Sequence, residues 1–193
     1  ISMGISIFVF NLIVLKRVGD IGVSAFGIIG YITSFITMTM IGFNQGTQPI
    51  LSFNLGARDF NKIQKLLKIS FILLGGIQLF FYILINIFKT DIVSIFLKDS
   101  TAIKLTVNAL KLYSIAYLIC GFNIFTAGYF TAINKVKISS TITFLRGIIL
   151  LILFLNTLPS IIGSNGIWLS VPFTEFVTLI VSLIFLKKYN PIK

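Results

Sequence analysis

Long apolar stretches alternate with short polar connections along the entire chain. The stretches cover residues 1–15, 21–53, 69–88, 105–132, 138–155 and 167–186. A membrane-spanning helix needs about 20 apolar residues to cross the hydrocarbon core of a bilayer. The first stretch is shorter, and the chain opens on an apolar residue without methionine, so we expect a helix that has lost its beginning. The pattern predicts an all-α integral membrane protein, a bundle of six transmembrane helices.

The connections between the stretches differ in character. Two of them, residues 54–68 and 89–104, carry apolar residues at helical spacing among their charges. We expect both to form amphipathic helices that lie along the membrane surface. A tight basic turn is predicted at residues 134–137, and an uncharged loop at residues 156–166, where proline and glycine interrupt the apolar pattern.

The composition agrees with lipid as the main solvent. Hydrophobic residues make up 56% of the chain and charged residues 11%, against about 25% charged residues in a typical soluble domain. Histidine is absent and Cys120 is the only cysteine, so an internal disulfide and a Cys/His zinc or iron–sulfur site are excluded. A Ser/His/Asp or Cys/His catalytic group is excluded as well. We expect neither an enzyme nor a bound metal or cofactor.

The net charge of +11 is explained by where the basic residues lie relative to the membrane. If residues 54–68 face the cytoplasm, then this connection, residues 134–137 and the C-terminal tail together carry nine lysines and arginines, whereas the opposite side carries five, with three acids. Basic residues gather on the cytoplasmic side of membrane proteins. We predict a multi-pass protein of the plasma (inner) membrane with a cytoplasmic C-terminus, whose partner is the lipid bilayer and not nucleic acid.

Glu175 is the only acid inside an apolar stretch, and a carboxylate at membrane depth is by default a functional candidate. Arg146 lies deep in the preceding stretch. A rise of 1.5 Å per residue places each of the two about 13 Å from its own membrane face. In a core of about 30 Å their depths then differ by about 3 Å. Three roles stay open for Glu175: a structural or gating ion pair with Arg146, a capping role, and direct work on substrate or protons.

Two prolines within apolar stretches predict helix kinks. Pro49 follows Gly46 near the end of the second stretch, and Pro172 precedes Glu175 by three residues. A proline inside a helix removes one backbone hydrogen bond and kinks or breaks the helix. A bent helix suits a transporter that rocks between two states.

Polar side chains at membrane depth are candidates for the lining of a substrate pathway. Tyrosines such as Tyr117 can stack on a flat aromatic cation, and they can equally pack against another helix. For the central cavity the candidates are Asn11, Thr37, Tyr117 and Asn123, and for its cytoplasmic end Gln45 and Gln48.

Residues 42–65, with the sequence GFNQGTQPILSFNLGARDFNKIQK, resemble the multidrug and toxic-compound extrusion (MATE) family. The stretch is similar to the end of the family's eighth helix and the cytoplasmic loop that follows. Two shorter stretches support the resemblance. AGYFTAINKVKIS at residues 127–139 is similar to the turn between helices ten and eleven, and GSNGIWLSVPFTEF at residues 163–176 to the start of helix twelve.

The resemblance implies a twelve-helix antiporter made of two six-helix lobes, of which this chain is the second. Such transporters export cationic or amphipathic drugs in exchange for Na⁺ or H⁺, and the missing N-terminal lobe would be the chain's partner. One branch of the family binds its coupling cation with acids on helices seven and ten. Residues 1–15 and 105–132, which correspond to these helices, contain no acid. This departure implies that the coupling carboxylate lies in the missing lobe.

Two other functions stay open. The wider superfamily includes lipid-linked oligosaccharide flippases, which need a strongly basic cavity, and we count Arg146 as the only deep basic residue. A non-transporting module that assembles with another chain in the membrane is the second alternative. The size of the native polypeptide distinguishes this module from a two-lobe transporter.

Overall fold

The computed structural model describes residues 2–189, and all of its regular elements are helices. Five crossings are long and apolar enough to span a membrane, and α1, with 17 described residues, is the sixth. The prediction of an all-α bundle with six crossings is confirmed. The elements are α1 (Ser2–Val18), α2 (Asp20–Gly56), α3 (Phe60–Phe96), α4 (Ser100–Tyr113), η1 (Ser114–Leu118), α5 (Cys120–Ala132), α6 (Val136–Phe144), η2 (Leu145–Ile149), α7 (Leu150–Ile162) and α8 (Asn165–Tyr189).

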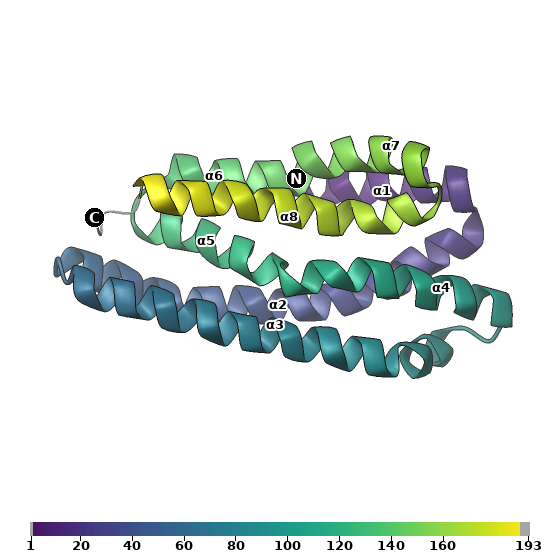
Figure 1. Ribbon diagram of the computed structural model, residues 1–193, viewed down its shortest axis with the longest axis horizontal. Coiled ribbons are helices and arrows are strands. Elements are labelled where there is room, and N and C mark those ends of the chain that lie inside the picture. The colour runs from purple at the N-terminus through teal and green to yellow at the C-terminus, as the bar shows by residue number, and fades with distance from the viewer. Residues whose placement is uncertain (1, 190–193) are drawn as a thin grey trace.

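The crossings run up and down along one long axis (Figure 1). The α2–α3 turn, the α5–α6 turn and the end of α8 meet at one end of the bundle, which we call the basic end. The α1–α2 turn, the α3–α4 loop and the α7–α8 turn meet at the opposite end. Within the described residues, the basic end carries Arg58, Lys62, Lys65, Lys68, Lys135, Lys137, Lys187 and Lys188.

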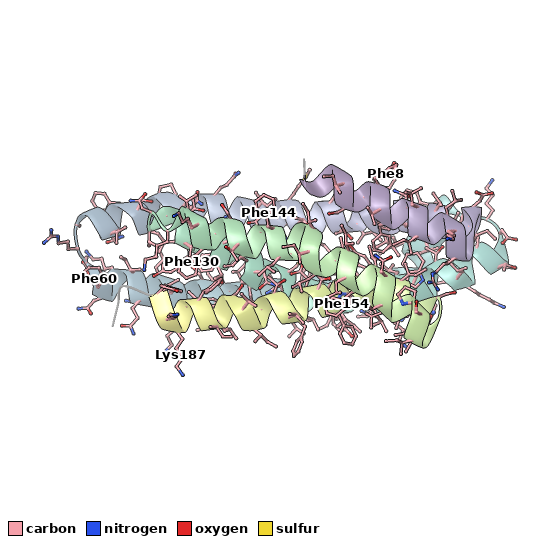
Figure 2. All side chains as sticks on the ribbon, turned by 90° about the horizontal axis from the view of Figure 1, so that it is seen from above. Phe8, Phe60, Phe130, Phe144, Phe154 and Lys187 are labelled. Atoms are coloured by element: carbon pink, nitrogen blue, oxygen red, sulfur yellow. The ribbon has the colours of Figure 1, made fainter. Side chains whose placement is uncertain are left out.

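The outer surface of the bundle is rich in large apolar side chains, and its core is dense in aromatic ones. Tyr117, Tyr129 and Phe130 are almost completely buried. Phe8 on α1 points away from the bundle and is 64% exposed, whereas Lys187 projects from the end of α8 (Figure 2). Because lipid tails are as apolar as these side chains, such a surface fits the bilayer rather than water.

The prediction of two separate surface helices is wrong. Residues 60–68 and 89–96 are the first and last turns of α3, which runs unbroken for 37 residues, and residues 100–104 begin α4. Asp59 caps α3 by accepting a hydrogen bond from the amide of Lys62 at 3.1 Å. A helix of this length extends about 55 Å, so α3 continues beyond a hydrocarbon core of about 30 Å.

The expected uncharged loop after the fifth stretch is largely helical. Helix α7 continues through Pro159 to Ile162. Its polar side chains satisfy their hydrogen-bonding groups within the helix: Asn156 Nδ2 donates to the carbonyl of Ile152 at 2.7 Å, and Thr157 Oγ1 donates one turn back at 2.9 Å. Polar residues therefore did not end this helix. Helices α2 and α8 likewise run through Pro49 and Pro172 without a break.

Candidate functional site

A buried polar cluster lies where α8, α5 and the π-helical turn η2 meet. The carboxylate of Glu175 is 3% exposed, and its Oε1 accepts a hydrogen bond from Arg146 Nε at 2.5 Å. Asn123 Nδ2 donates to the other oxygen, Oε2, at 2.7 Å and to the backbone carbonyl of Glu175 at 2.9 Å. Ser182 Oγ donates to Asn123 Oδ1 at 3.1 Å. Both carboxylate oxygens are thus occupied by donors from two other crossings.

The π-helical turn carries Arg146 in the otherwise α-helical α6–α7 crossing. A π-turn contains one extra residue and frees a backbone carbonyl, and such turns are frequent at functional sites. Here Ser6 Oγ on α1 donates to the carbonyl of Gly147, inside the turn. The turn therefore also joins α1 to the α6–α7 crossing.

A cavity of about 290 Å³ lies beside this cluster, between α2, α5, α6 and η2. Among the described residues on its wall, Arg146 is the only charged one. Asn44 lies on the wall, and its Oδ1 is buried without a hydrogen-bond partner in the part of the chain that the structure describes. Amides and hydroxyls supply the rest of the polar lining: Thr37, Gln48, Asn123, Thr131, Ser139 and Thr143.

Three of the six pathway residues predicted from sequence lie on this wall: Thr37, Gln48 and Asn123. Gln48 Nε2 donates to the carbonyl of Gly128 at 3.3 Å, which joins α2 to α5. Arg146 and Glu175, predicted to lie at similar depth, are in contact, and Arg146 reaches the wall whereas Glu175 lies behind it. Their roles in transport stay predictions.

The other three pathway residues lie elsewhere. Tyr117 is 1% exposed, and its hydroxyl is 2.9 Å from Thr33 Oγ1, so it packs between helices. Gln45 is exposed on α2, off the cavity wall. Asn11 Nδ2 donates to the carbonyl of Ile7 on its own helix at 3.0 Å. Spacing along a helix could not show which of these residues would share a cavity.

The fourth crossing contains a break that was not predicted from the sequence. The stretch 105–132 was predicted as one helix, but a 3₁₀ turn at Ser114–Leu118 separates α4 from α5. Gln78 Oε1 on α3 accepts a hydrogen bond from the backbone amide of Gly121 at 2.8 Å, next to the break. Asn86 Nδ2, also on α3, donates to Ser114 Oγ at 3.1 Å. Two amide side chains inside the very apolar stretch 69–88 were the available signal.

Arg146 was predicted to be the only basic residue deep in a crossing, but a second basic residue lies within a predicted stretch. Lys111 is on the exposed face of α4, eleven residues after its start. Lys111 does not line the cavity beside Arg146. Within residues 2–189, no group of three His, Cys, Asp or Glu side chains is placed to hold a metal ion.

A bundle of apolar crossings, with an ion pair at membrane depth beside a polar cavity, is the architecture of a multi-pass membrane transporter. The family model MatE matches residues 2–163. The chain therefore belongs to the MatE family of membrane transporters. No curated protein matches the chain in a sequence search.

Solved structures show the same fold. An outward-facing multidrug resistance MATE family transporter of the MOP superfamily superposes with a TM-score of 0.90 at 19% identity, over 97% of this chain and 42% of the other. An inward-facing transporter of the same description superposes with a TM-score of 0.88 at 20% identity, over 98% of this chain and 46% of the other. The chain thus spans less than half the length of the transporters it matches.

Proposed function

We propose that this chain is one lobe, helices seven to twelve, of a secondary antiporter that exports cationic or amphipathic organic compounds in exchange for Na⁺ or H⁺. Family membership and the fold support a transporter. The observation that carries the proposal is the polar cavity between α2, α5 and α6, which reaches Arg146, the partly exposed partner of the buried Glu175. The N-terminal lobe, on the far side of the pathway, would be the chain's partner.

Residues on the cavity wall are proposed to contact substrate. Thr37, Gln48 and Asn123 offer hydroxyl and amide groups, which orient a ligand without adding charge. We assign Arg146 and Glu175 a structural or gating role, because the pair joins α8 to the α6–α7 crossing. Rocking of the two lobes around a central site would then provide alternating access. Rocking requires that each lobe keeps its fold, and the same lobe fold occurs in both the outward-facing and the inward-facing structure.

The coupling carboxylate is proposed to lie outside this chain. Among the described residues, Glu175 is the acid buried within a crossing, and both of its carboxylate oxygens are already bound by Arg146 and Asn123. Replacing these donors with an ion would leave the guanidinium without its partner. We place the protein in the plasma (inner) membrane with the basic end and the C-terminus in the cytoplasm, following the distribution of lysine and arginine.

An efflux assay on the complete transporter tests the proposal. Bacterial cells that lack their own drug pumps are loaded with ethidium, and its release is followed by fluorescence under a Na⁺ gradient, a proton gradient or neither. Gln48→Leu should slow release about fivefold, the equivalent of one hydrogen bond of about 1 kcal/mol. Gln45→Leu is the matched control on the same helix and should leave the rate unchanged. Release without any gradient dependence, or no release by the wild type, contradicts the proposal.

A flippase for lipid-linked oligosaccharides is less well supported. A pyrophosphate needs several cations around it, and Arg146 is the single basic residue on the cavity wall within the described part of the chain. Its Nε is also committed to Glu175.

A further inference from the structure

A second cavity lies between α1 and α7, near the opposite end of the bundle. Its volume is about 300 Å³, and it shares no wall residue with the cavity beside the ion pair. The polar cluster around Glu175 takes no part in it. The residues on its wall are Ile13, Lys16, Arg17, Leu155 and Asn156.

The wall of this cavity changes from apolar to polar along the bundle axis. Ile13 on α1 and Leu155 on α7 form the apolar part, and Leu155 is 1% exposed. Lys16 and Arg17, in the last turn of α1, and Asn156 form the polar part. On the wall of this cavity, both helices therefore change from apolar to polar residues at one level. In a membrane protein this change marks the level of the lipid headgroups.

The polar part is positively charged and uncompensated. Among the described residues on the wall there is no acid. Arg17 is oriented by two contacts, Nη1 to the carbonyl of Pro159 and Nη2 to Ser160 Oγ, both at 3.3 Å. Lys16 is exposed and makes no hydrogen bond or ion pair with residues 2–189. An arginine fixed beside a free lysine matches the geometry and charge of a phosphate group.

We propose that this cavity binds the phosphate headgroup of an anionic phospholipid. Lys16 and Arg17 would contact the phosphate, Asn156 would bind a headgroup hydroxyl, and the first part of an acyl chain would lie against Ile13 and Leu155. Leu12 and Leu15, about half exposed on α1, continue the apolar surface for the rest of the chain. A zwitterionic headgroup binds less well, because its ammonium group lies close to the same two cations. The site is independent of the transported compound.

The binding is measured on the complete transporter in nanodiscs of phosphatidylcholine with and without phosphatidylglycerol. Native mass spectrometry reports which lipid stays bound after release from the nanodisc. We expect the wild type to retain phosphatidylglycerol in preference to phosphatidylcholine. Lys16→Gln should reduce this preference about fivefold, the effect of one basic residue near a charged headgroup. Because Lys16 makes no hydrogen bond or ion pair with the described residues, this variant tests the site even if Arg17→Gln fails to fold.

Three controls distinguish a specific lipid site from general surface charge, from a soluble anion and from a protein contact. Lys89→Gln/Lys98→Gln removes two basic residues of the same end that lie off the cavity wall, and it should keep the full lipid preference. An equal loss in this control, or no loss in Lys16→Gln, overturns the proposal. Soluble glycerol phosphate should not displace the lipid, and displacement would identify a soluble anion as the ligand. A Lys16→Cys variant that does not react with maleimide in lipid-free micelles shows that other protein covers the cavity, which also overturns it.

The readout is lipid retention rather than transport. A transporter that fails the ethidium assay and still retains phosphatidylglycerol through Lys16 refutes the proposed function alone. The reverse result refutes only the lipid site.

Discussion

Helix α3 and the α4–η1–α5 crossing are adjacent and similar in length, yet they are built in opposite ways. Helix α3 is unbroken over 37 residues, and 17% of an apolar 18-residue segment of this helix is buried. The α4–η1–α5 crossing is interrupted at mid-length, and half of the corresponding 18-residue segment is buried. The mean hydropathy of the two segments is 2.2 and 1.4, respectively. The more apolar helix thus faces outward, and the less apolar one lies inside.

The difference reflects what each environment demands of a side chain. Lipid satisfies any apolar surface, so the outer faces of α3 need only to be apolar. A broken helix at membrane depth is tolerated only where other groups satisfy its freed backbone. Gln78 on the inner face of α3 supplies one such contact, by accepting from the backbone amide of Gly121, and Asn86 adds a side-chain hydrogen bond to Ser114. The outer helix therefore helps to maintain the irregular inner one.

The largest effect is expected where the inner crossing meets α8. Glu175→Ala leaves the guanidinium of Arg146 without its ion-pair partner. It should destabilise the folded protein by about 3 kcal/mol, the lower end for a buried pair, because the Arg146 side chain is 29% exposed. Arg146→Ala/Glu175→Ala should recover much of this loss, because no uncompensated charge remains. The measurement is thermal unfolding of the purified complete transporter in detergent, analysed as a double-mutant cycle. Additive losses in the cycle would show that the two side chains do not stabilise each other.

A glycine on each crossing compares the inner and outer helices directly. A Cβ at Gly121 on α5 would lie 2.7 Å from Met40 Sδ and 3.0 Å from Gln78, so Gly121→Ala should cost up to about 3 kcal/mol from overpacking. A Cβ at Gly76 on α3 meets nothing within 4 Å, so Gly76→Ala should be neutral or stabilise by up to about 1 kcal/mol. Both variants are compared by melting temperature. Equal shifts would remove the distinction between the helices.

The hydrogen bond between the two crossings should have a smaller effect. Gln78→Leu leaves the buried amide of Gly121 unsatisfied, but it also removes Gln78 Nε2, which is buried without a partner in the described structure. We expect a net loss of about 1 kcal/mol, the lower end for an unsatisfied buried group. Hydrogen exchange of the Gly121 amide should rise at the same time. Ile83→Leu, at an exposed position of α3, is the control and should change neither quantity.

The smallest effect is expected at the polar start of α3, outside the membrane. Hydrogen bonds from the Lys62 side chain and backbone lower the pKa of Asp59 below its usual value. Because the pKa is lower in the folded state, the charged cap contributes stability above the unfolded pKa of about 4 and loses it as the pH falls through the folded pKa. The wild type should therefore melt at a higher temperature than Asp59→Asn at pH 7. The difference between the two melting temperatures should decline toward zero in acid. A difference that grows on acidification would contradict the lowered pKa.

The sequence predicted the crossings well and their interiors poorly. The apolar stretches are long enough to locate every crossing. The depths of Arg146 and Glu175 in the membrane were enough to predict that the two residues lie opposite each other. The 3₁₀ break at Ser114–Leu118 was not predictable from that stretch, because its residues are as apolar as a continuous helix requires. The ends of α3 and α7 were misjudged because charged and polar residues continue a helix that has already left the hydrocarbon core. Tyr117 and Gln45 show that a polar residue at the correct depth can still face a neighbouring helix or the outside.

The π-turn at Leu145–Ile149 has a consequence for evolutionary comparison. A turn with one extra residue corresponds to a single inserted codon, and everything before it is rotated by about 100° relative to an uninterrupted helix. A relative without the insertion should be one residue shorter between Val136 and Ile162. In such a relative the residue aligned with Arg146 would face a different direction, and an acid at the position of Glu175 would have lost its partner. The insertion and the acid should therefore be inherited together, and a lineage that loses one should soon lose the other.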